Sequence, residues 1–547
     1  MPKTTYTRLP LSYLLSKVTL PVVWLLLSWL GLTAVAVSAD TVEKIDAKKN
    51  VVFILLDDLP TDNFGFVNPR LNTPNIDALA EQGTYFPGAA VTTSLCSPSR
   101  ATILTGMTTR NHRIVDNNDS SEDHLTYFPS YLQEAGYETA FIGKWHLGRK
   151  TDNPRPGFDY WVSFKGQGTY LPKGDFGENQ TQTLNVNGED VERTTYMTDE
   201  LTNYQMHWLK ELRDPSKPFF LYMSHKAVHT VCRPAQRHKN QYADLTMEIP
   251  DNAHNTEKNN RNKPMWVQNQ RNSWHGSDIK HPQGLETMMD EKRDCDQVLS
   301  AVDDSVGVTL QYLKETGLDK NTMVVFFSDN GYLWGQHGLT DKRNAYEESV
   351  RVPMIVSLPG LVPEGKVSDA RIRNLDLAPT FLAIAGVNAP EHFDGQNTLP
   401  IITGDASWEE WDQQDFVYEY YWEWTFPATP TTFSIVRDNM KYIQYHGIWD
   451  LEELYDLDKD PNEMNNLIFD EQYENVRVDL RERLYRQLTN NRGLNTVPYT
   501  ERKSRGFVYR RESGADQARF PEQWMLETTP PGKPLDFPTV YEQAVKR

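Results

Sequence analysis

Two apolar stretches of the chain end in side chains that bind hard metal ions. NVVFILLDD ends in Asp57 and Asp58, and TMVVFFSDNG contains Asp329 and Asn330. Carboxylate and amide oxygens suit Ca²⁺ or Mg²⁺ better than Zn²⁺, which prefers imidazole and thiolate. A single Asp pair after a strand is often only a loop cap, but two such pairs indicate a shared site. The predicted metal ligands are Asp57, Asp58, Asp329 and Asn330.

Basic side chains also lie at the ends of apolar stretches. ETAFIGKWH contains Lys144 and His146, PFFLYMSHKAVH ends in His229, and Lys342 follows the SDNG segment. Together they would form a positive pocket in a chain whose net charge is −19. Such a pocket suits a small oxyanion such as sulfate or phosphate. Arg100 adds a planar guanidinium that matches the same oxygens.

Cys96 lies in SLCSPSRATILTG and is one of three cysteines. Pro98 is suited to the first turn of a helix, so ATILTG is predicted to be helical, and the helix dipole would favour negative charge at residue 96. A thiolate is the simplest nucleophile here, but it is a poor companion for Ca²⁺ or Mg²⁺. The spacing therefore predicts an exported, metal-dependent enzyme whose residue 96 attacks an oxyanion ester.

The elements that position these residues are predicted to be strands of a parallel sheet. The four stretches are apolar on both faces, as in central parallel strands. Helical patterns lie between them, including PNIDALAEQG and residues 296–314. This alternation predicts an α/β fold. The reactive side chains would then gather at the carboxyl edge of the sheet, where such folds bind ligands.

The rest of the chain is less regular. Residues 232–283 form a polar, Asn-rich insertion with little periodicity. From about Trp408 the pattern changes to short aromatic strands and one helix, which predicts a smaller α+β subdomain with an antiparallel sheet. The tail after about Arg492 lacks an apolar pattern of its own. We predict a catalytic domain over residues 40–404 and a C-terminal subdomain with an extended tail over residues 405–547.

Composition excludes several classes of protein. With 38% hydrophobic residues the chain has enough material for a core, which argues against disorder. The net charge of −19 disfavours a nucleic-acid partner and adhesion to anionic lipid. We therefore expect neither nucleic acid nor a stable membrane partner.

The N-terminus resembles an export signal in its physical pattern. Lys3, Arg8 and Lys17 precede an apolar run over residues 18–37, and small residues end at Ala39. This predicts a signal peptide over residues 1–39 and a periplasmic or secreted mature protein. Because the apolar run is long, an uncleaved anchor is the alternative.

CSPSRATILTG resembles the signature of type I sulfatases. The residues in pattern are Cys96, Pro98, Ser99, Arg100, Leu104, Thr105 and Gly106. The resemblance extends over about residues 50–467, through GKWHLG, SDNGYLWGQHGLTDKRNAYEESVRVPMIV, NLDLAPTFLAIAGV and ELYDLDKDPNEMNNL. It implies an alkaline-phosphatase-like fold and likeness to bacterial polysaccharide sulfatases.

The resemblance also implies chemical roles. A maturase acting on CSPSR would oxidise Cys96 to Cα-formylglycine, whose hydrate is the nucleophile and, with the four ligands above, binds Ca²⁺. Arg100 would stabilise the hydrate. Lys144, His229 and Lys342 would bind sulfate, and His229 or Lys342 would protonate the leaving oxygen. His146 would then take a proton from the second hydroxyl so that sulfate is expelled.

Candidate sugar contacts lie beside these motifs. His225, Lys226 and His337 are the first choices, although His225 is equally suited to the core. Weaker candidates are His112, Arg113 and the aromatic run 418–424, whose alternation a half-buried strand would also show.

The sequence thus predicts a secreted sulfatase that acts on a sulfated polysaccharide or oligosaccharide. A marine algal glycan such as carrageenan or ulvan is favoured, and a glycosaminoglycan is possible. The alternatives are a phosphonate or phosphodiester hydrolase on the same scaffold and a non-catalytic glycan-binding protein. Cys232 and Cys295 are an even pair that either forms a disulfide or stays free.

Overall fold

The computed structural model describes residues 48–118, 124–147, 151–176, 182–408, 415–423, 425–447 and 450–489. The predicted signal peptide and the tail after about Arg492 lie outside these residues. Among the helices of the described residues, none is both long enough and apolar enough to span a membrane.

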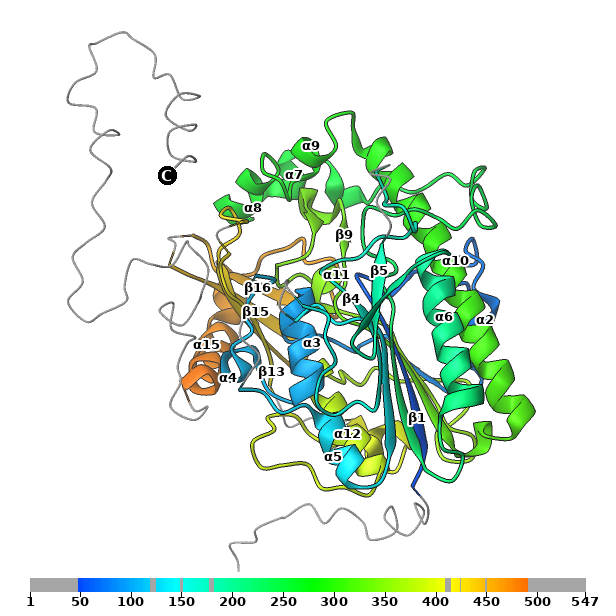
Figure 1. The fold of residues 1–547 in the computed structure, drawn as a ribbon. Coiled ribbons are helices and arrows are strands. Elements are labelled where there is room, and N and C mark those ends of the chain that lie inside the picture. The colour runs from blue at the N-terminus through cyan, green and yellow to red at the C-terminus, as the bar shows by residue number, and fades with distance from the viewer. Residues whose placement is uncertain are drawn as a thin grey trace, which may run out of the picture. The chain divides into compact units, whose positions relative to one another are not determined.

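A ten-stranded mixed sheet lies at the centre of the fold (Figure 1). Its strand order is β12-β2-β11-β8-β1-β7-β3-β4-β5-β6, and the five strands from β8 to β4 run parallel. The four strands predicted from the sequence are adjacent in it: β8 (Thr322–Ser328), β1 (Asn50–Leu56), β7 (Phe219–Ser224) and β3 (Glu138–Lys144). The others are β2 (Thr84–Phe86), β4 (Tyr160–Phe164), β5 (Thr183–Val186), β6 (Glu189–Glu192), β11 (Met354–Ser357) and β12 (Lys366–Val367).

The apolar runs explain why these four strands are central. Every residue of β1, β7 and β8 is buried, as expected when helices cover both faces of a parallel sheet. Val52 pairs with Leu221 on one side and with Val324 on the other. The predicted α/β fold with a mostly parallel sheet is therefore confirmed.

Helices cover the two faces of the sheet (Figure 1). One face carries α2 (Pro74–Glu81), α6 (Met197–His207) and α10 (Leu285–Thr316). The other carries α3 (Cys96–Thr105), α5 (Phe128–Glu134) and α12 (Leu377–Ile384). Two predicted boundaries were wrong: α3 begins at Cys96 rather than at Pro98, and α10 begins eleven residues before 296. Leu285, Met288 and Met289 already have helical spacing in the first turns of α10.

A four-stranded antiparallel sheet follows, as predicted. Its strands are β13 (Phe416–Tyr420), β14 (Thr431–Arg437), β15 (Met440–His446) and β16 (Glu453–Asp456), and α15 (Glu474–Thr489) packs on β14 and β15. Tyr418, Tyr420 and Ile443 of this sheet share one hydrophobic cluster with Leu95 and Tyr346. The domain boundary at 404/405 stays a prediction.

The insertion over residues 232–283 is more ordered than its sequence suggested. It contains η2 (Asp251–Ala253), α7 (Glu257–Asn260), α8 (Met265–Gln270) and α9 (Ser277–Lys280). Each is too short to show a helical period. Figure 1 shows α7, α8 and α9 beyond the end of the sheet at which β1 finishes. The insertion therefore lies near the carboxyl edge of the parallel strands. Short elements elsewhere are α4 (Thr109–His112), β9 (Leu333–Trp334), β10 (Thr340–Asp341), α11 (Glu347–Val350) and α13 (Leu399–Ile402).

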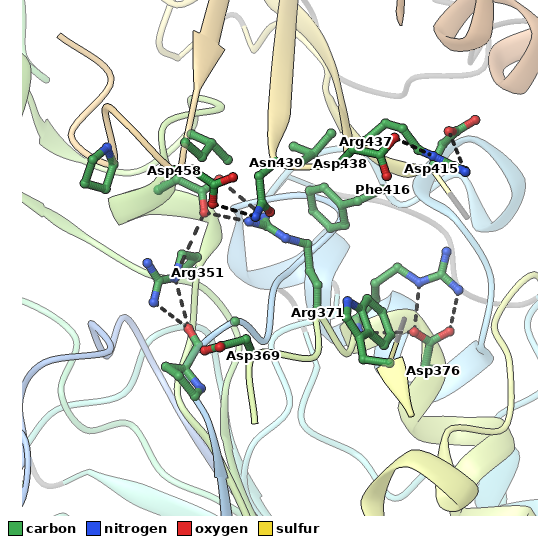
Figure 2. A pocket seen from close by; sticks show the side chains of 18 of the residues that line it. Arg351, Asp369, Arg371, Asp376, Asp415, Phe416, Arg437, Asp438, Asn439 and Asp458 are labelled. Carbon is green, nitrogen blue, oxygen red and sulfur yellow. Dashed lines mark hydrogen bonds and ion pairs between the residues drawn. The ribbon is translucent and has the colours of Figure 1, made fainter. Parts of the chain in front are cut away.

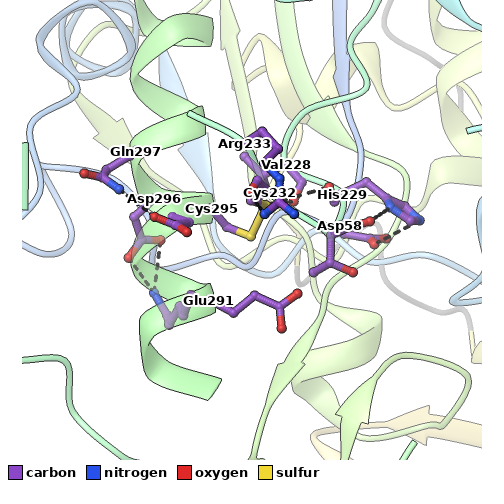
Figure 3. The surroundings of a disulfide bond; sticks show 12 residues. Asp58, Val228, His229, Cys232, Arg233, Glu291, Cys295, Asp296 and Gln297 are labelled. Carbon is purple, nitrogen blue, oxygen red and sulfur yellow. Dashed lines mark hydrogen bonds and ion pairs between the residues drawn. A yellow bond between two sulfur atoms is a disulfide. The ribbon is translucent and has the colours of Figure 1, made fainter. Parts of the chain in front are cut away.

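Cys232 and Cys295 form a disulfide, which decides the question that the sequence left open (Figure 3). Their Cα atoms are 5.1 Å apart, and both side chains are buried. The bond connects the start of the insertion to α10. Cys96 is a free, buried cysteine.

Candidate active site

The order of the strands brings the predicted residues together. Asp57 and Asp58 follow β1 directly, Asp329 and Asn330 follow β8, and Lys144 is the last residue of β3. His225, Lys226 and His229 follow β7. Because these four parallel strands are neighbours, their carboxyl ends meet at one edge of the sheet.

Three carboxylates and an amide form a compact oxygen cluster. Ligand oxygens of Asp57, Asp58 and Asp329 lie within 4.8 Å of one another. Asn330 Nδ2 donates to Asp58 Oδ1 over 2.6 Å, and the Asp58 N–H donates to Asp329 Oδ1 over 3.2 Å. Asp58 Oδ2 and Asn330 Oδ1 are buried without a hydrogen-bond donor in the described part of the chain. Unpaired buried oxygens are costly, so this donor set fits a hard divalent cation.

Cys96 is the first residue of α3 and points at this cluster. Its Sγ lies 3.6 Å from Asp57 Oδ1 and 3.2 Å from Lys342 Nζ. The next residue is fixed on two sides, since the Ser97 N–H donates to Asn117 Oδ1 over 2.9 Å and its hydroxyl donates to the His146 carbonyl. Burial raises the pKa of the Cys96 thiol to about 12, and Asp57 acts in the same direction. An unmodified thiol at this position therefore keeps its proton.

Arg100 lies one helical turn further along α3 and connects four strand ends. Its Nε donates to Asp329 Oδ2 over 2.8 Å, and its Nη1 donates to the Lys144 carbonyl and to Ser224 Oγ, each over 2.7 Å. Its Nη2 lies 3.4 Å from Asp57 Oδ2. The side chain is 1% exposed, and its contacts with Asp57 and Asp329 hold these two carboxylates in place.

Two lysines and a histidine surround the carboxylates, and burial together with the charge of Lys144 holds the pKa of that histidine well below its usual range. Lys144 Nζ contacts Asp57, Lys342 Nζ contacts Asp58, and His229 Nε2 lies 3.8 Å from Asp58 Oδ2. Burial opposes ionisation of Asp57, but Lys144 and the other cations hold its pKa well below the usual range. Burial raises the pKa of Asp58 to about 7 against the opposing charge of Lys342.

His146 lies beside the cluster with its ring buried. Its Nδ1 has no hydrogen-bond partner among the described residues. Burial and the charge of Lys144 lower its pKa well below the usual range. The neutral imidazole can therefore accept a proton.

The residues proposed for sugar contacts fall into two groups. Lys226 Nζ lies 4.3 Å from the centroid of the Tyr170 ring, and the Tyr170 hydroxyl donates to the His229 carbonyl over 2.7 Å. Lys226 is thus part of the site. Burial lowers its pKa to about 8. His225 is 1% exposed and burial lowers its pKa to about 3, which fits a core residue.

His337 packs against Tyr346 and Glu348 rather than at the oxygen cluster, so its position does not support a sugar contact. Its side chain is fully buried, stacks on Tyr346 at 4.0 Å between ring centroids, and faces Glu348 at 3.5 Å. Of the weaker candidates that the structure describes, Arg113 and Trp422 are half-buried and the others are buried. His112 is 0% exposed and bonds Thr102. Tyr418, Tyr420 and Tyr421 are buried, so the aromatic strand serves the core, and Trp424 lies outside the described residues.

Three further residues support the site and were missed from the sequence. Gln167 Oε1 accepts from Lys144 Nζ, Asn117 holds the start of α3, and Ser224 bonds Arg100. An isolated Gln, Asn or Ser carries no distinctive pattern, so no signal was available for Gln167 and Asn117. Ser224 lies at the predicted end of β7, and that position was the one available clue.

Comparison with known proteins decides the family. The Sulfatase family profile matches residues 49–387, which is more than half of the chain. The chain belongs to the sulfatase family. It is therefore a hydrolase of sulfate esters. A second profile, N-sulphoglucosamine sulphohydrolase, C-terminal, matches residues 335–490.

Relatives and solved structures agree with this assignment. An N-acetylglucosamine-6-O-sulfatase of Bacteroides thetaiotaomicron is 30% identical over 503 residues, which is 81% of this chain and 87% of that protein. The N-acetylglucosamine-6-sulfatase of Homo sapiens is 29% identical over 475 residues, 77% of this chain and 81% of that protein. The structure of BT4656 with its substrate D-glucosamine-2-N,6-O-disulfate has a TM-score of 0.73 and 26% identity, covering 84% of this chain and 100% of that one.

A phosphonate monoester hydrolase from Silicibacter pomeroyi shares the fold alone. Its TM-score is 0.64 at 21% identity, covering 82% of this chain and 96% of that one. The fold of this sulfatase is alkaline-phosphatase-like, as the sequence resemblance implied.

Proposed function

We propose that this sulfatase removes a 6-O-sulfate from glucosamine residues of a sulfated glycan, with formylglycine at residue 96 as nucleophile and Ca²⁺ as cofactor. The observation that supports it most is the position of Cys96. Its Sγ lies 3.6 Å from a carboxylate of the oxygen cluster and 3.2 Å from Lys342 Nζ. A sulfate bound by Lys342, Lys144 and His229 would face residue 96.

The metal ligands are proposed to be Asp57, Asp58, Asp329 and Asn330, together with residue 96. The cation, when bound, withdraws negative charge from the sulfate oxygens. Arg100 holds Asp57 and Asp329 in place through its 3.4 Å and 2.8 Å contacts. Arg100 thereby keeps these two acidic groups close together before any ligand enters.

The first step is transfer of the sulfuryl group. A maturase acting on CSPSR converts Cys96 to formylglycine, and water adds to the aldehyde to give two hydroxyls. One hydroxyl oxygen attacks sulfur and gives its proton to a neighbouring carboxylate, for which Asp57 is the candidate because its Oδ1 lies 3.6 Å from Cys96 Sγ. The bond between sulfur and the sugar oxygen breaks, and the sugar oxygen takes a proton from His229 or Lys342. Lys144 and Lys342 stabilise the charge on the transferred group.

The second step releases sulfate. His146 takes the proton of the remaining hydroxyl, the carbonyl bond re-forms, and the carbon–oxygen bond to sulfate breaks. Water then hydrates the aldehyde again. A serine at position 96 would lack this second hydroxyl and would stop at the sulfate ester.

The proposed substrate class follows from the relatives. Two relatives named N-acetylglucosamine-6-sulfatases cover most of this chain, which favours an amino sugar over the algal glycan expected from the sequence. We also retain export, and with it an extracytoplasmic glycan substrate, as part of the proposal.

The test is desulfation of a defined panel. N-acetylglucosamine-6-sulfate, glucosamine-2-N,6-O-disulfate and carrageenan oligosaccharides would be incubated with co-expressed, matured enzyme. Selective loss of the 6-O-sulfate, read by NMR, is expected. In parallel, the rates of hydrolysis would be compared for a sulfate ester and a phosphate ester that share the same leaving group. Faster phosphate turnover, or full activity of a chain whose residue 96 is unmodified by mass spectrometry, would overturn the proposal.

A further inference from the structure

One segment of the insertion is fixed beside the site at two points. His275 Nε2 lies 3.4 Å from Asp341 Oδ2, directly before Lys342. Lys280 Nζ donates to the Tyr332 hydroxyl over 2.8 Å, two residues after Asn330. The segment from residue 273 to residue 280 therefore packs against the two chain segments that carry the proposed cation ligand Asn330 and the proposed sulfate ligand Lys342.

The backbone of this segment is also held firmly. The Thr340 N–H donates to the His275 carbonyl over 2.8 Å, and Gly276 forms an isolated β-bridge with Leu339. A Cβ at Gly276 would lie 2.1 Å from the Gln270 carbonyl, so the close turn needs glycine. The His275 ring stacks on Phe426 with 4.2 Å between ring centroids.

Trp274 is the exception in this packed turn. Its neighbours His275 and Ser277 are 5% and 1% exposed, whereas Trp274 is 68% exposed. The indole contributes little to the core, although its backbone is anchored. The turn that carries this large apolar side chain is bonded to residues close in sequence to Asn330 and Lys342, so the indole is placed to contact a ligand of the site.

We infer that Trp274 is the stacking wall for the sugar ring of the substrate, an inference that rests on the proposed function. The sulfate of a sugar ester enters the cationic pocket, so its ring must lie at the mouth of that pocket. A pyranose ring presents C–H groups on its faces, which pack on an indole, and hydroxyls at its edge, which suit charged neighbours such as Asp341. Figure 1 shows α9, which follows Trp274, beyond the end of β1.

The aromatic run 418–424 was one of the weaker sequence candidates for a sugar contact, but Tyr418, Tyr420 and Tyr421 are buried and Trp422 is half-buried. Trp274 lies in the insertion, to which the sequence assigned no chemistry. The sugar-binding aromatic residue is therefore placed on a different element, which is anchored to the catalytic strand ends.

The test separates the sugar ring from the sulfate. In a Cys96→Ala background, which binds without turnover, the affinity for N-acetylglucosamine-6-sulfate and for inorganic sulfate would be measured by calorimetry. Adding Trp274→Ala is expected to weaken saccharide binding about tenfold, because an aromatic contact of this kind contributes about 1.4 kcal/mol. Binding of inorganic sulfate should not change, and Trp274→Phe should keep most of the saccharide affinity.

The matched control is Phe469→Ala, which removes an aromatic side chain that is 66% exposed and lies in the C-terminal part of the chain. It should change neither affinity. Equal saccharide affinity with and without Trp274 would overturn the inference while leaving the proposed function intact. If the background binds sulfate but no sulfated sugar, and the matured enzyme desulfates none, both the proposed function and the inference fail.

Discussion

At the scale of single residues, the buried carboxylates of the site are stabilised by the cations that contact them. Asp57, Asp58 and Asp329 would repel one another strongly if they were buried alone. Lys144, Lys342 and Arg100 offset that repulsion through direct contacts. The same cations are the ones proposed to bind sulfate. The polar residues of the pocket therefore serve both folding and ligand binding.

The role of His146 gives a kinetic prediction. His146→Ala should allow the first transfer but block release of sulfate, because no group would take the proton of the second hydroxyl. The variant should release about one equivalent of desulfated sugar per matured enzyme and then stall. Mass spectrometry of the peptide carrying residue 96 should show the retained sulfate ester.

His112→Ala is the control for that experiment, since this buried histidine of α4 bonds Thr102 of α3 and has no proposed proton transfer. It should turn over repeatedly if it folds. Steady turnover by His146→Ala at the rate of the parent would contradict the assignment of His146.

Glu348 gives a prediction on pH. Burial raises its pKa to about 7 from 4.5, against the opposing charges of Lys441 and Lys263, and its neighbour His337 is neutral. Between these two pH values the folded protein holds a proton that the unfolded chain has released. Its contribution to stability therefore falls as the pH rises from 4.5 to about 7.

Glu348→Gln keeps the shape and removes the charge. The variant should gain about 1 to 3 kcal/mol of unfolding free energy relative to the parent at pH 8, and little near pH 4.5. Because the side chain is 20% exposed, the lower end of this range is expected. Urea unfolding of the variant and the parent at the two pH values measures this gain. An equal difference in unfolding free energy at both pH values would contradict the titration of Glu348.

At the scale of elements, close contact between β3 and β7 positions Lys144. Gly143 pairs with Ser224 across these strands, and a Cβ at Gly143 would lie 1.8 Å from the Ser224 carbonyl, with φ of +125°. Gly143→Ala should destabilise the protein by about 3 kcal/mol or more. Gly136→Ala, at φ of +87° with nothing within 4 Å, should cost about 1 kcal/mol. Thermal unfolding of both variants tests this, and similar melting temperatures would contradict it.

A second prediction at this scale concerns the contribution of the disulfide to stability. Cys232 follows the loop that carries His229, and its Sγ lies 3.7 Å from the His229 carbonyl (Figure 3). The sequence separation of 63 residues between the two cysteines predicts a loss of about 4 kcal/mol when both become Ala. Guanidinium unfolding measures this loss. A double variant as stable as the parent would show that the bond contributes nothing.

Secondary-structure elements could be predicted from the sequence where nearly all of their residues are buried. The four central strands could be located because their apolar runs are long and end in charged residues. The short helices of the insertion could not, since one turn carries no period. His337 was misplaced because its motif lies next to Lys342 in the sequence, while the intervening turn directs its ring toward Tyr346.

At the scale of the whole molecule, the proposed cation site lies at the carboxyl ends of the central strands. Ca²⁺ should stabilise the folded chain by about 2.7 kcal/mol at a concentration one hundred times its dissociation constant. Thermal unfolding with and without a chelator measures this shift. Asn330→Ala should reduce it, because the variant loses one of the two unpaired oxygens. An unchanged melting temperature on chelation would contradict the calcium proposal.

A second pocket lies apart from the strand ends and illustrates how the two sheets join (Figure 2). It has a volume of about 740 Å³ and is lined by charged residues that include Arg351, Arg371, Asp369 and Asp376. Arg371 pairs with Glu347, which also contacts Lys441 of the small sheet. Such long-range pairing between distant parts of the chain leaves no local pattern, so it could not be predicted from the sequence.

The disulfide has one practical consequence for maturation. The sequence has three cysteines, and two of them are bonded to each other. In the unfolded but unreduced chain, thiol reagents therefore react with residue 96 alone. An unconverted chain should give one thiol and a fully converted chain none. A colorimetric thiol assay thus counts the fraction of enzyme that the maturase has processed.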